Sequence, residues 1–167
     1  MKLEIIKVKE SDEAYIQIMT EWIYKWWGEA EGYPKDEIHS FCRHSISENR
    51  IPQTFLALAD GKPAGMYQIL MSDCKSRTDV YPWLTDVYVD EAFRGLGIAK
   101  SLLESVPEKA RQLHLKELYL YTHLQGFYEK FGWEFVEYFD PYTTPEGIQR
   151  LYCLKLTCQA ENNQKND

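Results

Sequence analysis

The run RGLGIAK, residues 94–100, has the residue types and spacing of an anion-binding turn. Gly95 and Gly97 allow a tight turn and a close approach of the backbone to a ligand. Apolar spacing from Ile98 onward predicts that a helix begins here, so unpaired N–H groups and the positive end of the helix dipole would face a bound phosphate. Arg94 adds a full positive charge. From glycine spacing alone, a turn that only joins a strand to a helix stays open as an alternative.

Two other phosphate-binding motifs do not fit this turn. No Lys-Ser or Lys-Thr follows at the Walker spacing, and the third glycine of a dinucleotide fingerprint is missing. RGLGIA instead resembles the acetyl-CoA pyrophosphate loop of the GCN5-related N-acetyltransferases (the GNAT family), which also follows a strand ending in Val-x-Val. The segment GFYEKFGWEFVEY, residues 126–138, resembles a second motif of that family. The resemblance covers nearly the whole chain and leaves out only the tail after Leu156.

The resemblance implies an acetyl-CoA-dependent N-acetyltransferase in which a primary amine, expected on a small molecule, attacks directly in a ternary complex. The pyrophosphate would be held by Arg94, Gly95, Leu96, Gly97, Ile98, Ala99 and Lys100. The thioester carbonyl and the pantetheine arm would meet the backbone of Val87, Tyr88 and Val89. Two alternatives stay open: an acetyltransferase acting on a protein or peptide amine, and a catalytically silent acyl-CoA-binding module.

Acetyl transfer to an amine needs a proton acceptor for the amine and a proton donor for the departing thiolate. By resemblance, Tyr128 lies near the thioester sulfur as the general acid, and its ordinary pKa of about 10 suits that role. The base is harder to identify, because Trp83 stands near the place where some family members carry a glutamate. Asp86 is the nearest carboxylate, although strand alternation turns its side chain away from the neighbouring valines unless a bulge re-aims it. His123 and a water relay are the other candidates.

Aromatic and acidic residues near two loops, 28–34 and 72–82, and near residue 142 are the candidates for the acceptor pocket. Aromatic walls and carboxylates would suit a cationic amine, although such residues are more often core or solvated. The expected substrate residues are Trp27, Tyr33, Asp73 and Trp83. Further candidates are the aromatic residues Trp26, Tyr81 and Tyr142 and the carboxylates Glu29, Glu31 and Asp79.

Hydrophobic periodicity predicts one α/β domain of the α+β type over residues 1–157, followed by a polar, disordered tail over 158–167. Strands are expected over 3–8, 54–59, 64–71, 83–89, 117–122, 133–138 and 150–156, with Asp60-Gly61 as a hairpin turn. Helices are expected from an N-cap at Ser11 to Gly28, over 35–46, from 98 onward and over 126–131. Pro107 should kink or break the third helix, leaving 108–113 as a separate segment.

The resemblance adds the arrangement of these elements. It implies a mixed, mostly antiparallel sheet of six or seven strands, flanked by about four helices. The strands ending at Val89 and Thr122 should lie side by side in parallel and splay apart to admit the cofactor.

Net charge, apolar runs and cysteine spacing limit the classes of partner that the protein could bind. The net charge of −7 argues against a nucleic acid bound through a basic face. No apolar run approaches the ~18 residues that span a bilayer, and no signal-peptide core is present, so we expect a cytoplasmic protein without a membrane partner. The four cysteines form no Cys-x-x-Cys pair, so no metal is expected. A homodimer is the assembly to be considered.

Overall fold

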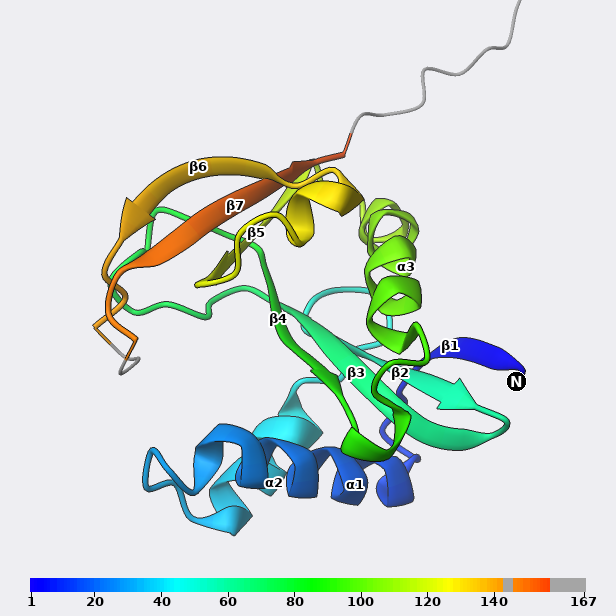
Figure 1. Ribbon diagram of the computed structural model, residues 1–167. Helices are drawn as coiled ribbons and strands as arrows, with labels where there is room; N and C mark the ends of the chain where they lie inside the picture. Colours follow the sequence, from blue (N-terminus) through cyan, green and yellow to red (C-terminus); the bar gives the residue numbers. More distant parts are fainter. Residues whose placement is uncertain (143–145, 157–167) are drawn as a thin grey trace, which may run out of the picture.

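The computed structural model describes residues 1–142 and 146–156 and contains a seven-stranded mixed sheet with the order β1-β2-β3-β4-β5-β7-β6 (Figure 1). Neighbouring strands are antiparallel except for the parallel pair β4–β5. This confirms the predicted sheet. The strands are β1 Leu3–Lys7, β2 Gln53–Ala59, β3 Lys62–Leu70, β4 Trp83–Val89, β5 Glu117–Thr122, β6 Glu134–Phe139 and β7 Gln149–Lys155.

Helices cover both faces of the sheet. The alternation of side chains along β2 shows this, because Leu56 and Leu58 pack in the core under the first two helices, whereas Phe55 and Ala57 pack in the core under the third. Within residues 1–142 and 146–156 there are three α-helices, α1 Glu13–Ile23, α2 Lys35–His44 and α3 Ile98–Gln112, and shorter helical turns complete the set. The short helix expected over 126–131 is a 3₁₀ turn, Tyr128–Phe131, and another 3₁₀ turn spans Glu91–Phe93.

The first helix begins one residue later than expected, and α1 itself ends at Ile23, before the predicted end near Gly28. Asp12, not Ser11, is the N-cap, and its carboxylate accepts a hydrogen bond from the Lys9 N–H at 2.9 Å. After α1 the chain continues as a π-helical turn, Tyr24–Gly28. A Cβ on Gly28 would lie 3.1 Å from Ile38, so glycine lets this turn approach α2 closely. Such π turns often occur at functional sites.

The expected break at Pro107 is absent, and 108–113 is not a separate segment. Helix α3 runs continuously through the proline. Val106 and Ala110, on either side of Pro107, are both fully buried in the core under α3. Packing on both sides of the proline therefore holds the helix together against a local cost of about 3 kcal/mol.

The parallel strands β4 and β5 meet only at their N-terminal ends. Their ladder contains one pair, Trp83 with Tyr119, next to a 2.9 Å hydrogen bond from the Tyr119 N–H to the Pro82 carbonyl. Beyond this point β5 pairs with β7 along its whole length. The two strands separate in Figure 1, which confirms the predicted splay. The tail predicted over 158–167 lies outside the described residues.

Candidate active site

The turn before α3 presents a row of unpaired backbone donors. Gly95 and Gly97 adopt left-handed φ angles of 78° and 80°. From Gly95 to Lys100, no N–H group makes a well-formed hydrogen bond within the described residues, and the Ser101 N–H is the first to bond, to the Gly97 carbonyl at 3.1 Å. Ile98, which is 1% exposed, anchors the helix start in the core. The turn therefore fits a pyrophosphate group.

Glycine is required at two kinds of place around this turn. A Cβ on Gly95 or Gly97 would meet nothing within 4 Å, so the left-handed backbone and not crowding demands glycine. A Cβ on Gly65 of β3 would lie 2.6 Å from the Tyr88 carbonyl and 3.2 Å from Ile98. Gly65 thus lets α3 approach the sheet. Sequence reasoning missed it, although an isolated glycine inside a strand is the signal for such an approach.

The basic side chains near the turn are exposed and only loosely paired. Arg94 donates from Nε to the Val89 carbonyl at 3.3 Å and lies 3.6 Å from the Glu91 carboxylate. Lys100 is paired with Glu104, one helical turn onward, at 3.7 Å. Both cations remain accessible to an anion at the turn.

The backbone of β4 has one free edge. Tyr88 and Val89 pair with Met66 and Gly65 of β3. On the other side, no strand pairs with β4 beyond Trp83 within the described residues. An extended ligand could therefore lie along this edge, as an added strand does.

Tyr128 lies in an aromatic setting that keeps it protonated. Its ring is half-buried and contacts Phe127, Trp133 and Tyr152, with centroid distances of 5.2–6.3 Å. Burial raises the pKa of the hydroxyl to about 12. Within the described residues the hydroxyl has no hydrogen-bond partner. The group is thus a protonated donor at neutral pH.

Asp86 sits on a β-bulge. The β3–β4 register jumps so that Met66 faces Tyr88 while Gln68 faces Thr85, and Asp86 takes a left-handed φ of 50°. Asp86 accepts a hydrogen bond from Trp27 Nε1 at 3.0 Å, which places its carboxylate on the side of α1. Burial raises its pKa to about 6, although hydrogen bonds from Trp27 and Thr85 oppose the shift.

Other carboxylates gather around Asp86. Asp73 accepts a hydrogen bond from the Thr85 hydroxyl at 3.1 Å, and burial, aided by the charge of Asp86, raises its pKa to about 7. Partial burial and the charge of Glu146 raise the pKa of Glu31. The loops after α1, after β3 and after β6 thus contribute negative charge to one region. We call Glu31, Asp73 and Asp86 the carboxylate cluster.

The other acidic candidates lie apart from this cluster. Asp79 is exposed and binds Arg77, whose guanidinium also contacts Glu137 at 2.8 Å. Its charge is therefore already neutralised. Glu29 is exposed at the surface.

The aromatic candidates divide between pocket and core. Trp27 is half-buried and packs edge-on against Tyr33 at 5.8 Å, beside the carboxylate cluster. Trp83 is 0% exposed and packs with Cys74 and Leu151, so it offers no surface to a substrate. The expectation that Trp83 lines the acceptor pocket is therefore corrected: its aromatic ring belongs to the core.

His123 is exposed just after β5 and has no hydrogen bond or ion pair within the described part of the chain. Nothing in the structure orients it as a base. Among the candidates, only Asp86 is both held by a hydrogen bond and placed on β4 itself.

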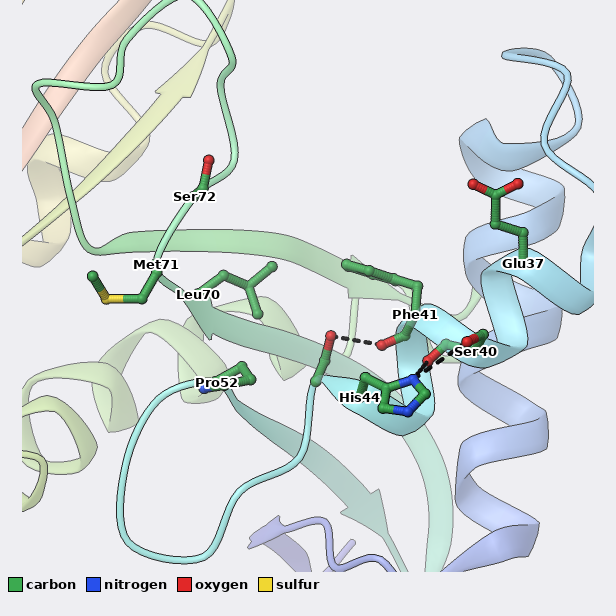
Figure 2. A pocket seen from close by; sticks show the side chains of 9 residues that line it. Glu37, Ser40, Phe41, His44, Pro52, Leu70, Met71 and Ser72 are labelled. Atoms are coloured by element: carbon green, nitrogen blue, oxygen red, sulfur yellow. Dashed lines mark hydrogen bonds between the residues drawn. The ribbon is translucent and has the colours of Figure 1, made fainter.

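A surface pocket of about 460 Å³ adjoins the carboxylate cluster, between α2 and the end of β3 (Figure 2). Phe41, in its lining, packs against Trp27 at 6.4 Å, and Ser72 directly precedes Asp73. The lining residues are Glu37, Ser40, Phe41, His44, Ser45, Pro52, Leu70, Met71 and Ser72.

No group of three or more His, Cys, Asp or Glu side chains among the described residues is arranged to hold a metal ion. No helix in that part of the chain has the length and apolar character to cross a membrane.

Comparison with known proteins identifies the family. The acetyltransferase (GNAT) family profile matches residues 16–133. No curated protein sequence is significantly similar to the chain. Among solved structures, an aminoglycoside 6'-N-acetyltransferase complexed with coenzyme A is similar with a TM-score of 0.73, 13% identity and coverage of 95% of this chain and 99% of that one.

Two further structures show the same fold. An aminoglycoside 6'-acetyltransferase type Ii has a TM-score of 0.71 and 15% identity, covering 94% of this chain and 99% of its own. The ribosomal-protein-S18-alanine N-acetyltransferase from Escherichia coli has a TM-score of 0.65 and 15% identity, covering 98% and 100%. At these identities the likeness concerns the fold, and the family profile decides membership. The chain therefore belongs to the GNAT family of acetyltransferases.

Proposed function

We propose that this acetyltransferase transfers the acetyl group of acetyl-CoA to a primary amine on a small molecule, with Asp86 as the base and Tyr128 as the general acid. The observation that carries the proposal is the bulged carboxylate of Asp86. It lies on the strand with the open edge, is held by Trp27, and has a pKa raised to about 6. Such a group is ionised at neutral pH and can accept the proton of an ammonium.

The residues present fit acetyl-CoA. The pyrophosphate would be held by the N–H groups of residues 95–100, with Arg94 and Lys100 nearby, and the open edge of β4 at Val87, Tyr88 and Val89 would hold the pantetheine arm. When bound, acetyl-CoA supplies the acetyl group as a thioester. N–H groups on the β4 edge would polarise its carbonyl.

Proton movement involves two side chains of opposite character. The Asp86 carboxylate takes a proton from the incoming amine, and the Trp27 Nε1–H fixes the orientation of that carboxylate. The Tyr128 hydroxyl, kept protonated by burial, donates a proton to the departing sulfur. His123 has no part in this account.

The carboxylate cluster favours a small cationic acceptor over the two alternatives. Burial raises the pKa of both Asp73 and Asp86, and a compact ammonium reaches such partly buried carboxylates more easily than a folded protein surface does. The comparison structures act on aminoglycosides and on a ribosomal protein, so the fold accommodates both kinds of acceptor. An oriented base and a protonated donor favour an enzyme over a silent acyl-CoA-binding module.

We further infer that the enzyme works in the cytoplasm and forms a homodimer. The three described cysteines, Cys42, Cys74 and Cys153, are free thiols, which suits a reducing compartment. The edge strand β6 exposes Val136 and Tyr138, which supports pairing with a second copy. Sedimentation measurements would show a dimer, and a monomer at all concentrations would contradict this inference.

The direct test is a thiol-release assay with acetyl-CoA across a panel of small amines and peptides. The proposal predicts thiol release with at least one small amine, accompanied by a product heavier by one acetyl group. Acetylation of peptides alone would favour the protein-amine alternative. Acetyl-CoA binding without thiol release on any amine would favour the silent module.

A further inference from the structure

The carboxylate cluster holds negative charge without a cation. Asp73 and Asp86 each accept a hydrogen bond, from Thr85 and from Trp27. Among the described residues, the neighbouring charges that raise the pKa values of Glu31, Asp73 and Asp86 are those of other carboxylates. Like charges in a partly buried site repel one another, and an external cation would relieve that repulsion.

Gln68 independently indicates a missing donor at the same place. Gln68 is 0% exposed, and its Oε1 has no hydrogen-bond partner among the described residues. Its Nε2 donates to the Thr54 hydroxyl on β2 at 3.0 Å, which leaves Oε1 on the side of Thr85, its neighbour on β4. Thr85 is the residue that contacts Asp73. A buried acceptor without a donor is costly, so a ligand donor near Asp73 would be stabilising.

The assignment of the Gln68 amide follows from its partner. The Thr54 hydroxyl has a single proton, and it donates that proton to the Ser45 carbonyl at 2.8 Å. Thr54 can therefore only accept from Gln68, which requires the NH₂ group on that side. The unpaired atom is thus the oxygen, an acceptor, like every carboxylate around it.

The acceptors are spread over the site rather than converging on one point. Within the described residues, no three of them could share one metal ion. They come from β3, from β4, from the loop before α2 and from the loop after β3. Such an arrangement suits separate ammonium groups on one molecule, each with N–H donors and a positive charge.

We propose that the acceptor is a small molecule with at least two ammonium groups, of which one reacts at Asp86 while the other is held by Asp73 and the unpaired oxygen of Gln68. The inference rests on the proposed function and specifies its substrate class. Linear diamines and amino sugars with several amino groups share this chemistry. Asp73 in this account determines specificity and does not touch the reacting atoms.

The first experiment compares acceptors matched in length. Diaminobutane should exceed butylamine in kcat/KM by roughly 10- to 100-fold, the range of one added charge-assisted contact. Turnover of a longer polyamine and of an amino sugar with several amino groups then shows which of these two kinds of molecule is the better acceptor. Equal or better turnover of butylamine would overturn the inference while leaving the proposed function intact.

The second experiment locates the contact. Asp73→Asn should lower kcat/KM for diaminobutane more than kcat/KM for butylamine, so that the ratio of the two falls toward 1, because butylamine has no second charge. Glu108 is exposed on α3, on the other face of the sheet. Glu108→Gln makes the same change in net charge and should keep the preference for diaminobutane. A preference retained by Asp73→Asn would overturn the assignment.

Calorimetry provides a readout besides turnover. Diaminobutane should bind the intact protein and bind the folded Asp73→Asn variant at least about 10-fold more weakly. If no amine is acetylated, the proposed function fails, and this measurement still decides the inference. No binding to the intact protein, or equal binding to both proteins, would overturn it.

Discussion

The two ends of the site are opposite in charge and in construction. The cofactor end is a row of backbone N–H donors from six consecutive residues, 95–100. The acceptor end is a set of side-chain acceptors, Glu31, Asp73 and Asp86, from separate segments of the chain. A phosphate site can thus be made by one turn and one helix start, whereas the proposed amine site requires the tertiary fold. Changes at the first end should act locally, and changes at the second should also affect stability.

The largest effect is expected at the cofactor end, from Gly97→Glu. The variant places bulk and negative charge where N–H groups would meet the pyrophosphate, and it strains a backbone at φ 80°. We expect acetyl-CoA affinity to fall by at least roughly 100-fold, measured by calorimetry on the folded variant.

A matched control separates strain from charge at the site. Gly61 in the β2–β3 hairpin has a similar φ of 78° and open space around its Cα. Gly61→Glu should lose comparable stability and keep full acetyl-CoA affinity. Equal affinity in both variants would move the pyrophosphate away from residues 95–100.

The next effect tests the proton donor between the two ends. Tyr128→Phe should keep its ring packing and its acetyl-CoA affinity, while kcat falls by roughly 10²- to 10⁴-fold, the range for losing a general acid. Tyr138→Phe, exposed on β6, is the control and should turn over normally. A Tyr128→Phe enzyme with the parent rate would show that water, and not Tyr128, protonates the departing thiolate.

A smaller effect concerns stability at the acceptor end. Asp73 has a folded-state pKa of about 7, above the unfolded value of about 3.9, so its protonation stabilises the fold. That contribution is fully present below about pH 4 and is lost as the pH rises through about 7. Asp73→Asn resembles the protonated form, so it should raise the free energy of unfolding by about 1–3 kcal/mol at about pH 8 and by little at about pH 4.

Urea denaturation at both pH values measures this difference. Glu108→Gln, an exposed carboxylate on α3, should show no such pH dependence. Destabilisation by Asp73→Asn at the higher pH would mean that the Asp73 carboxylate has a cationic partner in solution, which would contradict a buried carboxylate surrounded by other carboxylates.

Sequence patterns that are local in the chain predicted their structures. The glycines at 95 and 97 and the helix that follows are adjacent in sequence, so their types determine the turn. The Asp60-Gly61 hairpin is another such case, with φ angles of 49° and 78°. The parallel pairing of the strands that end at Val89 and Thr122 was expected from the family resemblance and could not be obtained from the strand runs alone.

Features that depend on tertiary contacts could not be decided from the sequence alone. A bulge at Asp86 stayed open as an alternative, because the β3–β4 register determines it and no pattern within β4 reveals it. Trp83 is an aromatic residue of the kind that lines pockets, but its ring is buried against Leu151 of β7. Proline ordinarily breaks a helix, and the packing that keeps α3 continuous through Pro107 is not visible in the sequence. Gly65 is required by the approach of α3, a contact between distant segments.

The most direct test of the account is the pH dependence of kcat/KM in the parent enzyme and in Asp86→Asn. Asparagine keeps the size of aspartate and tolerates the left-handed φ, so the bulge should remain. The parent kcat/KM should rise with pH and level off above about 6, as Asp86 loses its proton. In the variant, kcat/KM should not show this rise with pH and should be lower by roughly 10²-fold or more, with unchanged acetyl-CoA affinity. A variant with the same rise of kcat/KM and the parent rate would show that Asp86 is not the base.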